Sequence, residues 1–359
     1  MDQINNNLTR VAVIGASGYG GLQTIRLLKD HPFFQISYLA GKKTSNKKWN
    51  QLCPFLPLED DPTIKPINIE QIASSCDTAI LSLPNGLSSE LTPKLLDSNI
   101  KVVDLSADFR YRSLSKWKEI YSIESRKPER KDKELCARAI YGLPEWNGSN
   151  IAKATLVASP GCFPTASLLL IIPFLKQGLI EKDGIIIDAK SGTSGGGREA
   201  REHLLLSEAS ETFSPYAVIG HRHTSEIEQE LSLVSGTDIN LQFTPHLVPM
   251  VRGILCTVYA RLRDPCLTAE DCKIVLEAIY RKHNNIEVLP VGTYPNTKWV
   301  RYTNKAQLSV QVDKRNGRVI LMSTIDNLLK GQAGQAIQSL NLMSGLEMDM
   351  GLPLNSFYP

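Results

Sequence analysis

The sequence predicts an α/β protein of two domains. The first is an N-terminal Rossmann-like domain with a doubly wound parallel sheet, and the second is an α+β substrate domain with a mixed or antiparallel sheet. The 359 residues exceed the usual size of one domain. In the first third, β-branched runs alternate with helical stretches, as in βαβ units. From about residue 184 onward, strand-like runs follow one another with few helices between them.

The apolar runs place the elements of each domain. Strands are expected at 11–14 and 34–39, with a helix at 20–29 between them, and the segments 78–83 and 101–105 have the near-continuous apolar character of buried parallel strands. The later strands are expected at 184–189, 242–247, 254–262, 307–312 and 318–322. Residues 327–343 carry apolar side chains at helical spacing, and the polar stretch 122–133 is expected to be solvated surface. We expect residues 1–159 and 327–359 to form the nucleotide-binding domain, and 160–326 the catalytic, substrate and oligomerisation domain.

Composition restricts the classes of function. The 42% hydrophobic residues exclude a fully disordered chain, and a net charge of +3 offers no argument for binding to nucleic acid or a membrane surface. No secretory signal and no apolar run of membrane-spanning length is visible. The seven cysteines show no CxxC and no metal-ligand spacing. We therefore predict a cytoplasmic protein with mostly free thiols and no metal site.

A glycine-rich turn follows the first predicted strand. Gly15, Gly18 and Gly21 form a GxxGxxG variant of the dinucleotide fingerprint, in which missing side chains let a pyrophosphate approach a helix N-terminus. A plain strand-to-helix turn is the alternative, but the context favours a dinucleotide. NAD sites carry an acid at the end of the second strand, whereas this chain has Lys42 and Lys43. The cofactor is therefore predicted to be NADP.

One cysteine stands in a distinctive place. The segment SPGCFPT precedes the apolar stretch 166–175, and Pro164 suits the first turn of a helix. Cys162 would then lie at or just before a helix N-terminus, where the helix dipole stabilises a thiolate. The alternative, a buried inert cysteine, is our expectation for the other six. Cys162 is the predicted nucleophile.

Two further segments carry polar groups suited to catalysis. His221, Arg222 and His223 precede Ser225-Glu226-Ile227-Glu228, a predicted capping box that would open a helix. They could supply a base and bind an anion, or form a cation-rich surface loop. The loop 190–198, rich in glycine and hydroxyl groups, suits an anion-binding nest but equally a flexible linker. Of the other histidines, His31, His203 and His283 are expected at the surface. His246 lies within a predicted strand and is expected in the core.

Taken together, these segments resemble the N-acetyl-γ-glutamyl-phosphate reductase family of the semialdehyde dehydrogenase superfamily. The similar motifs are, in order, VAVIGASGYGG, LSLPNG, VVDLSADFR, YGLPE, SPGCFPT, KSGTSGGGR, HRHTSEIEQEL, FTPHLVPMVRGI and DNLLKGQAGQAIQSLN. The resemblance implies NADPH-dependent reduction of N-acetyl-γ-glutamyl phosphate to the semialdehyde, with release of phosphate, in arginine biosynthesis. It also implies a cysteine thioester and a homo-dimer or homo-tetramer.

The resemblance assigns roles residue by residue. Cys162 matches the nucleophile and His221 the acid/base histidine, with His223 as the less favoured candidate. The resemblance also matches Gly15, Ser17, Gly18, Tyr19, Gly20 and Asn327 to cofactor contacts and Arg110 to a phosphate contact. From the residues themselves we add Lys42, Ser191 and Gly192 as expected cofactor contacts, and Arg198, Arg222 and His223 as expected substrate or phosphate contacts. The chain departs from the family pattern at Tyr302, where a small glycine is expected.

Two other hypotheses stay open on the sequence. Within the same superfamily, the chain could be an aspartate-semialdehyde dehydrogenase or a carrier-linked aminoadipyl phosphate reductase. Rates of the reverse reaction, measured with each aldehyde in the presence of phosphate and NADP, would distinguish these enzymes. Outside catalysis, it could be an NADP-binding sensor on the same fold. A sensor would bind the cofactor without thiol reactivity, so selective alkylation of Cys162 at neutral pH would argue against it.

Overall fold

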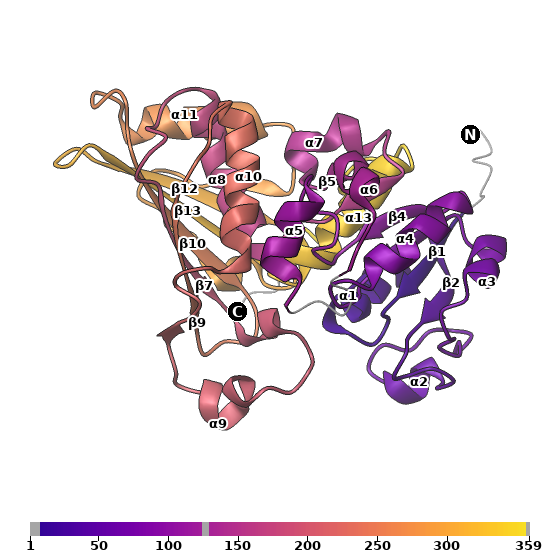
Figure 1. Ribbon diagram of the computed structural model, residues 1–359. Coiled ribbons are helices and arrows are strands. Elements are labelled where there is room, and N and C mark those ends of the chain that lie inside the picture. Colours follow the sequence, from indigo (N-terminus) through magenta and orange to yellow (C-terminus); the bar gives the residue numbers. More distant parts are fainter. Residues whose placement is uncertain (1–7, 124–128, 357–359) are drawn as a thin grey trace, which may run out of the picture. The chain divides into compact units, whose positions relative to one another are not determined.

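The computed structural model describes residues 8–123 and 129–356. The chain divides into two compact units, which are described separately here (Figure 1). The first unit contains Met1–Pro160 and Gln332–Leu352, and the second contains Gly161–Gly331 and Pro353–Pro359. The chain thus enters the second unit at the residue before Cys162.

The first unit is built on a six-stranded parallel sheet with the strand order β2-β1-β3-β4-β6-β5. Its strands are β1 (Thr9–Ile14), β2 (Phe34–Ala40), β3 (Thr78–Leu81), β4 (Lys101–Asp104), β5 (Ile140–Tyr141) and β6 (Leu156–Ala158). Because β1 lies between β2 and β3, the strand order reverses there, and ligands of such sheets bind beyond the carboxyl ends of the strands at this point. The predicted Rossmann-like domain is confirmed.

Helices accompany this sheet. They are α1 (Tyr19–Lys29), α2 (Trp49–Leu52), α3 (Ile69–Ser75), α4 (Ser88–Asp97), α5 (Leu114–Tyr121), α6 (Lys133–Arg138), α7 (Pro144–Ile151) and α13 (Gly334–Met343). The last of these comes from the end of the chain and packs against α1, α7 and β4. Its Ala336, Ile337 and Leu340 are fully buried, which explains the helical apolar spacing in the sequence.

The second unit is built on a seven-stranded mixed sheet with the order β11-β12-β13-β10-β7-β9-β8. Its strands are β7 (Ile186–Ser191), β8 (Ser214–Pro215), β9 (Gln242–Leu247), β10 (Ile254–Arg261), β11 (Ile286–Val288), β12 (Ala306–Asp313) and β13 (Arg318–Ile325). Four central strands, β12, β13, β10 and β7, pair antiparallel, while β7 with β9 and β11 with β12 pair parallel. The predicted mixed sheet is confirmed.

Helices α8 (Cys162–Lys176) and α11 (Ala269–Tyr280) lie on one face of this sheet. The other helices of this unit are α9 (Leu206–Ala209), α10 (Arg222–Ser235) and α12 (Thr297–Val300). The almost wholly buried α8 packs against β10, β13 and α10, and α11 packs against β12 (Figure 1). On β10 the buried Cys256 and Val258 alternate with the half-exposed Thr257 and Tyr259, so the opposite face of the sheet is more open. Within the described residues, no helix is both long enough and apolar enough to cross a membrane.

Two expectations about polar residues are wrong. The stretch 122–133 is not all solvated, because Arg130 is buried, lies 3.8 Å from the Asp108 carboxylate and stacks over Trp117. Residues 124–128 of that stretch lie outside the described residues. His31 is buried as well, and its ring stacks on Phe34 at 4.2 Å. Both side chains are held by residues distant in sequence or by ring stacking, which polarity alone does not predict.

Two expected helix starts also differ. The helix predicted over 327–343 is divided, with a π-helical turn at Leu329–Ala333 before α13 begins at Gly334. The predicted capping box at Ser225 does not open a helix, because α10 begins at Arg222 with His221 as its N-cap. The Asp326 carboxylate accepts the N–H groups of Leu328 and Leu329 where the π-helical turn begins, and the His221 ring accepts the His223 N–H at the start of α10.

Candidate active site

The glycine-rich turn of the first unit forms a cradle beyond β1 at the point of strand reversal. Gly15 has φ +91°, and a Cβ there would lie only 2.0 Å from the backbone oxygen of Ser82. A Cβ on Gly20 would lie 2.6 Å from the Oγ of the same serine. Gly18 is the N-cap of α1 and supplies no capping side chain, so first-turn N–H groups are left for an anion. The geometry fits a dinucleotide pyrophosphate.

The surroundings of the turn fit a nucleotide with an additional phosphate. Ser17 and Tyr19 are half-buried, and the Thr44 hydroxyl donates to the Ser17 Oγ at 3.4 Å. Lys42 and Lys43 follow β2 and are exposed. No Asp or Glu occurs from residue 31 to 58, so no carboxylate of that segment opposes a 2′-phosphate.

Arg110 holds the turn that leads to Cys162. It is buried, and its Nε and Nη2 donate to the backbone oxygens of Ser159 and Leu105 at 2.8 and 3.0 Å. The side-chain amide of Gln335 donates to the Pro160 oxygen at 3.2 Å. Two successive carbonyl groups before Cys162 are therefore held by buried side chains of the first unit.

A buried acidic pair near Arg110 was missed by the sequence reasoning. Asp108 accepts hydrogen bonds from the N–H groups of Gly86 and Ser89, at the start of α4, at 2.7 and 2.9 Å. Burial raises the pKa of Asp104 and of Asp108, and the Arg130 cation opposes the increase at Asp108. The polar residues inside the predicted strand-end motif VVDLSADFR were the available signal, because buried polar groups must find partners.

Cys162 is the first residue of α8, with Gly161 as an N-cap that has no capping side chain. The residue is partly exposed, unlike the buried Cys136 and Cys256, whose thiol pKa burial raises to about 11 and about 12. The Phe163 N–H belongs to the first turn of α8, whose donors have no acceptor within the helix. The position therefore combines access with a helix N-terminus that favours a thiolate.

Helix α10 contacts the Gly161 peptide through two side chains. Glu226 is fully buried, and its Oε1 accepts the Gly161 N–H at 2.8 Å. A Cβ on Gly161 would lie 2.4 Å from His223 Nε2, so the imidazole lies directly against this glycine. His223 and Glu226 are three residues apart, on one face of α10. The structure thus brings His223 next to the residue that precedes Cys162.

His221 occupies a different environment from His223. Its Nδ1 accepts the His223 backbone N–H at 3.1 Å and so caps α10. Aromatic rings surround it, with the rings of Phe243 and Tyr216 centred 5.2 and 5.6 Å away. Burial, and then the Arg222 cation, lower the pKa of His221 to about 4. At neutral pH the ring is uncharged, and the bonded Nδ1 places its proton on Nε2.

Asn327 joins the glycine-rich loop of the second unit to a neighbouring turn. Its Nδ2 donates to the Ser194 Oγ, and its Oδ1 accepts the Gly253 N–H, both at 2.9 Å. Ser191 is buried at the end of β7, and a Cβ on Gly192 would lie 2.7 Å from the Val251 oxygen. The loop is therefore tied down at its start and is not a free linker. Its Arg198 is exposed.

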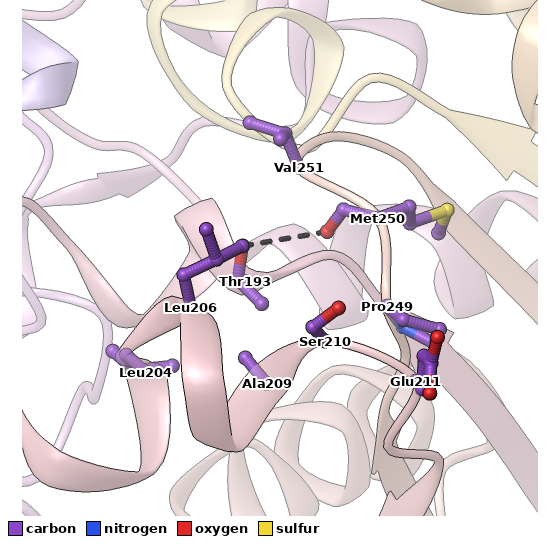
Figure 2. Close-up of a pocket in the computed structure, with 9 residues that line it drawn as sticks. All are labelled: Thr193, Leu204, Leu206, Ala209, Ser210, Glu211, Pro249, Met250 and Val251. Carbon is purple, nitrogen blue, oxygen red and sulfur yellow. Dashed lines mark hydrogen bonds between the residues drawn. The ribbon is translucent and has the colours of Figure 1, made fainter.

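A cavity of about 480 Å³ borders this loop (Figure 2). The Thr193 hydroxyl lies 3.4 Å from the Met250 oxygen at its edge. Its walls are mostly apolar and are formed by Thr193, Leu204, Leu206, Ala209, Ser210, Glu211, Pro249, Met250 and Val251. Leu206 and Val251 are 83% and 69% exposed, so the apolar lining is open to solvent.

The site residues inferred from sequence fall into two groups. The first unit holds the cradle of Gly15, Ser17, Gly18, Tyr19 and Gly20, together with Lys42 and Arg110. The second holds Cys162, the histidine pair with Arg222, and the loop cluster of Ser191, Gly192, Arg198 and Asn327. Over the residues that the structure describes, no three His, Cys, Asp or Glu side chains are grouped as a metal site would require.

Both units match known protein families. Residues 10–154 match the family model of the semialdehyde dehydrogenase NAD binding domain, and residues 162–327 match that of the semialdehyde dehydrogenase dimerisation domain. Two solved aspartate-semialdehyde dehydrogenases share the fold. The Candida albicans enzyme, solved with NADP, has a TM-score of 0.71 and 16% identity, and enzyme II of Vibrio cholerae has 0.71 and 19%. Each comparison covers 94% of this chain and 99% of the other.

The fold and the two matched domains thus define a semialdehyde dehydrogenase, an oxidoreductase with a nicotinamide-dinucleotide domain. Curated relatives named N-acetyl-γ-glutamyl-phosphate reductase are much more similar in sequence. One from Prochlorococcus marinus is 70% identical over 359 residues and 100% of both chains, and one from Parasynechococcus marenigrum is 65% identical over 350 residues and 98% of both. The chain belongs to the N-acetyl-γ-glutamyl-phosphate reductase family, and the resemblance inferred from its motifs is confirmed.

Proposed function

We propose that the chain reduces N-acetyl-γ-glutamyl phosphate to N-acetyl-glutamate 5-semialdehyde with NADPH, releasing phosphate. Full-length identity to reductases of that name supports the substrate. The observation that carries the chemistry is the partly exposed Cys162 at the start of α8, whose N-cap glycine contacts both His223 and Glu226. This arrangement suits a thiolate nucleophile at neutral pH.

The covalent step uses the Cys162 sulfur. The thiolate attacks the acyl carbon, a C–S bond forms, and the bond from that carbon to the phosphate oxygen breaks, which leaves a thioester and free phosphate. Bound NADPH supplies the hydride that reduces the thioester carbon. Breaking the C–S bond then returns the thiolate and releases the aldehyde. N–H groups at the start of α8, including that of Phe163, would stabilise the oxyanion.

The two histidines are proposed to divide the proton chemistry. His223 lies against Gly161, the residue before Cys162, and is proposed to accept the Cys162 proton. His221, with its pKa lowered to about 4 and its Nδ1 already accepting a hydrogen bond, is a poor base at neutral pH. Its Nε2–H can instead donate to the carbonyl oxygen, as an uncharged electrophile. The geometry therefore supports His223 as the base, although the family resemblance favours His221.

The cradle at Gly15 to Gly20 is proposed to hold the NADPH pyrophosphate, and Lys42 the 2′-phosphate. Ser191, Gly192 and Asn327 are proposed to approach the nicotinamide end. Arg198 and Arg222 are candidates for the anionic groups of the substrate. Because the buried Arg110 already donates to two carbonyl oxygens, we propose that its main task is to hold the turn before Cys162.

We also propose a homo-dimer or homo-tetramer in the cytoplasm. The match of the second unit to a dimerisation domain supports self-association. The half-exposed residues of the open sheet face, such as Thr257, Tyr259 and Ile320, would pair with a second copy. Light scattering of Tyr259→Glu against the wild type tests this: the variant should dissociate, and an unchanged mass would contradict the use of this face.

The reaction is tested by the reverse assay, NADP reduction by N-acetyl-glutamate 5-semialdehyde and phosphate. We expect Cys162→Ser to lose turnover while binding NADP with unchanged affinity, because the cradle belongs to the other unit. Cys266→Ser, which alters an exposed cysteine, is the matched control and should keep wild-type rates. Near-normal rates of Cys162→Ser, or a preference for aspartate semialdehyde in the wild type, would overturn the proposal.

A further inference from the structure

Asp326 directly follows β13, and its fully buried carboxylate accepts four hydrogen bonds. Its Oδ2 accepts from Arg252 Nη1 at 2.9 Å and from the Tyr302 N–H at 2.8 Å. Its Oδ1 accepts from the N–H groups of Leu328 and Leu329 at 2.9 and 3.1 Å. Three segments of the second unit are thus joined at one side chain.

The first segment contains the residue that departs from the family pattern. Tyr302 has φ +64°, a left-handed conformation that a bulky residue rarely adopts and that suits glycine. The Asp326 carboxylate holds its N–H, and the Arg252 guanidinium lies 4.8 Å from its ring centre. The two contacts together maintain a strained backbone, a feature that tends to occur near functional sites.

The second segment is the π-helical turn that follows β13. The Leu328 and Leu329 contacts hold its start, and the Gly331 N–H donates to the backbone oxygen of Asp326 at 3.0 Å. Gly331 has no side chain, and a Cβ there would lie 2.8 Å from the Cβ of Cys162. The turn organised by Asp326 therefore packs directly against Cys162. Single π-helical turns of this kind are frequent at functional sites.

The third segment runs through Arg252 and Gly253. Asp326 forms an ion pair with Arg252, and the side-chain oxygen of Asn327 accepts the N–H of Gly253. Asn327 also binds Ser194 in the glycine-rich loop. Asp326 thus holds the turn that packs against Cys162, and the next residue, Asn327, holds the glycine-rich loop that we propose contacts the nicotinamide.

We infer that Asp326 is a positioning residue for the Cys162 site, acting through Gly331 and through Arg252. A buried ion pair is weak support for stability by itself, because desolvation offsets the attraction. The consequence of placing the carboxylate here is geometric, since it holds both the start of the turn that packs against Cys162 and the Arg252 side chain, next to Gly253. The kinetic consequence rests on the proposed function, whereas the effect on the thiol does not.

The test is Asp326→Asn, which keeps one oxygen acceptor and removes the charge that pairs with Arg252. The matched control is Asp313→Asn, which breaks an Asp–Arg contact of 2.8 Å to Arg315 at the opposite end of the same β12–β13 hairpin. Four quantities are measured: the alkylation rate of Cys162 by iodoacetamide across pH, kcat, KM and the NADP dissociation constant.

We expect Asp326→Asn to change the alkylation rate at least about threefold and to lower kcat at least about tenfold, as small misplacements of reacting groups do. NADP affinity should stay within about twofold, and Asp313→Asn should leave all four quantities unchanged. A lower unfolding midpoint with wild-type alkylation and kcat would mean that the residue is only structural and would overturn the inference.

A second variant covers the case in which Asp326→Asn does not fold. Arg252→Met removes the cation that pairs with Asp326 and leaves the backbone N–H contacts of Asp326 in place. It should change the alkylation rate and kcat in the same direction as Asp326→Asn, but by less. Wild-type alkylation and kcat in this variant would also overturn the inference. If the wild type itself fails to turn over N-acetyl-glutamate 5-semialdehyde, the proposed function is wrong. The alkylation rates then decide the role of Asp326 independently.

Discussion

The buried carboxylate of Glu226 accepts the backbone N–H of Gly161 at 2.8 Å. This contact joins the N-terminal half of α10 to the N-cap of α8, between residues 65 positions apart in the chain. Glu226 therefore helps to set the direction in which Cys162 leaves the preceding turn.

Replacing Glu226 by alanine should separate positioning from stability. The variant loses the acceptor for Gly161, so we expect kcat to fall at least about tenfold. The matched control is Glu228→Ala, which removes an acceptor for the Leu241 N–H, 3.1 Å away, on the same helix. Both variants should lose roughly 1–3 kcal/mol of stability, but the control should keep its kcat. Equal loss of kcat in both would contradict the role of Glu226.

The histidines should respond differently to the same substitution. His221→Asn keeps a good N-cap for α10 and removes the proposed electrophile. We expect it to lower kcat without moving the pH at which Cys162 becomes reactive. His223→Asn removes the proposed base, so it should lower kcat by about 10²-fold or more and change the pH dependence of the rate. Stopped-flow rates from pH 5 to 9 measure both. The reverse pattern would assign the base to His221.

His221 should also make stability dependent on pH. Its folded-state pKa of about 4 lies below the ordinary 6.5 of the unfolded chain, so between these values the unfolded state binds more protons. Stability is therefore expected to fall as the pH drops from about 6.5 to 4, by at most about 3 kcal/mol. Urea unfolding of the wild type and of His221→Asn measures this part of the slope.

The control for this experiment is His203→Asn, which alters an exposed histidine. It should follow the wild-type pH dependence. If His221→Asn shows the same loss of stability on acidification as the wild type, the burial of His221 is not the cause.

The lysines after β2 should select the cofactor. In the double variant Lys42→Gln, Lys43→Gln we expect KM for NADPH to rise roughly 3- to 10-fold and KM for NADH to stay unchanged, because only NADPH carries the 2′-phosphate. The wild-type preference for NADPH should also weaken at high salt. Lys153→Gln, an exposed lysine elsewhere in the first unit, is the control. Parallel increases for both cofactors would place the 2′-phosphate elsewhere.

Much of the fold and part of the site followed from local patterns. Buried parallel strands produced continuous apolar runs, and Gly15 marked a turn that no other residue fits, since its φ is +91°. Cys162 begins α8 as Pro164 in the first turn suggested. Tyr302 was noticed only as an exception to a family pattern, and its left-handed backbone explains why glycine is expected there.

The sequence by itself determined the two sheets, the glycine cradle and the helix start at Cys162, because each depends on neighbouring residues with a regular period or a required backbone angle. Tertiary structure alone decided which polar side chains are buried and what they hold. Glu226 meets Gly161 across 65 residues, and Asp326 meets Arg252 across 74. A pattern of adjacent residues carries no information about such distant partners, and burial then makes each contact obligatory.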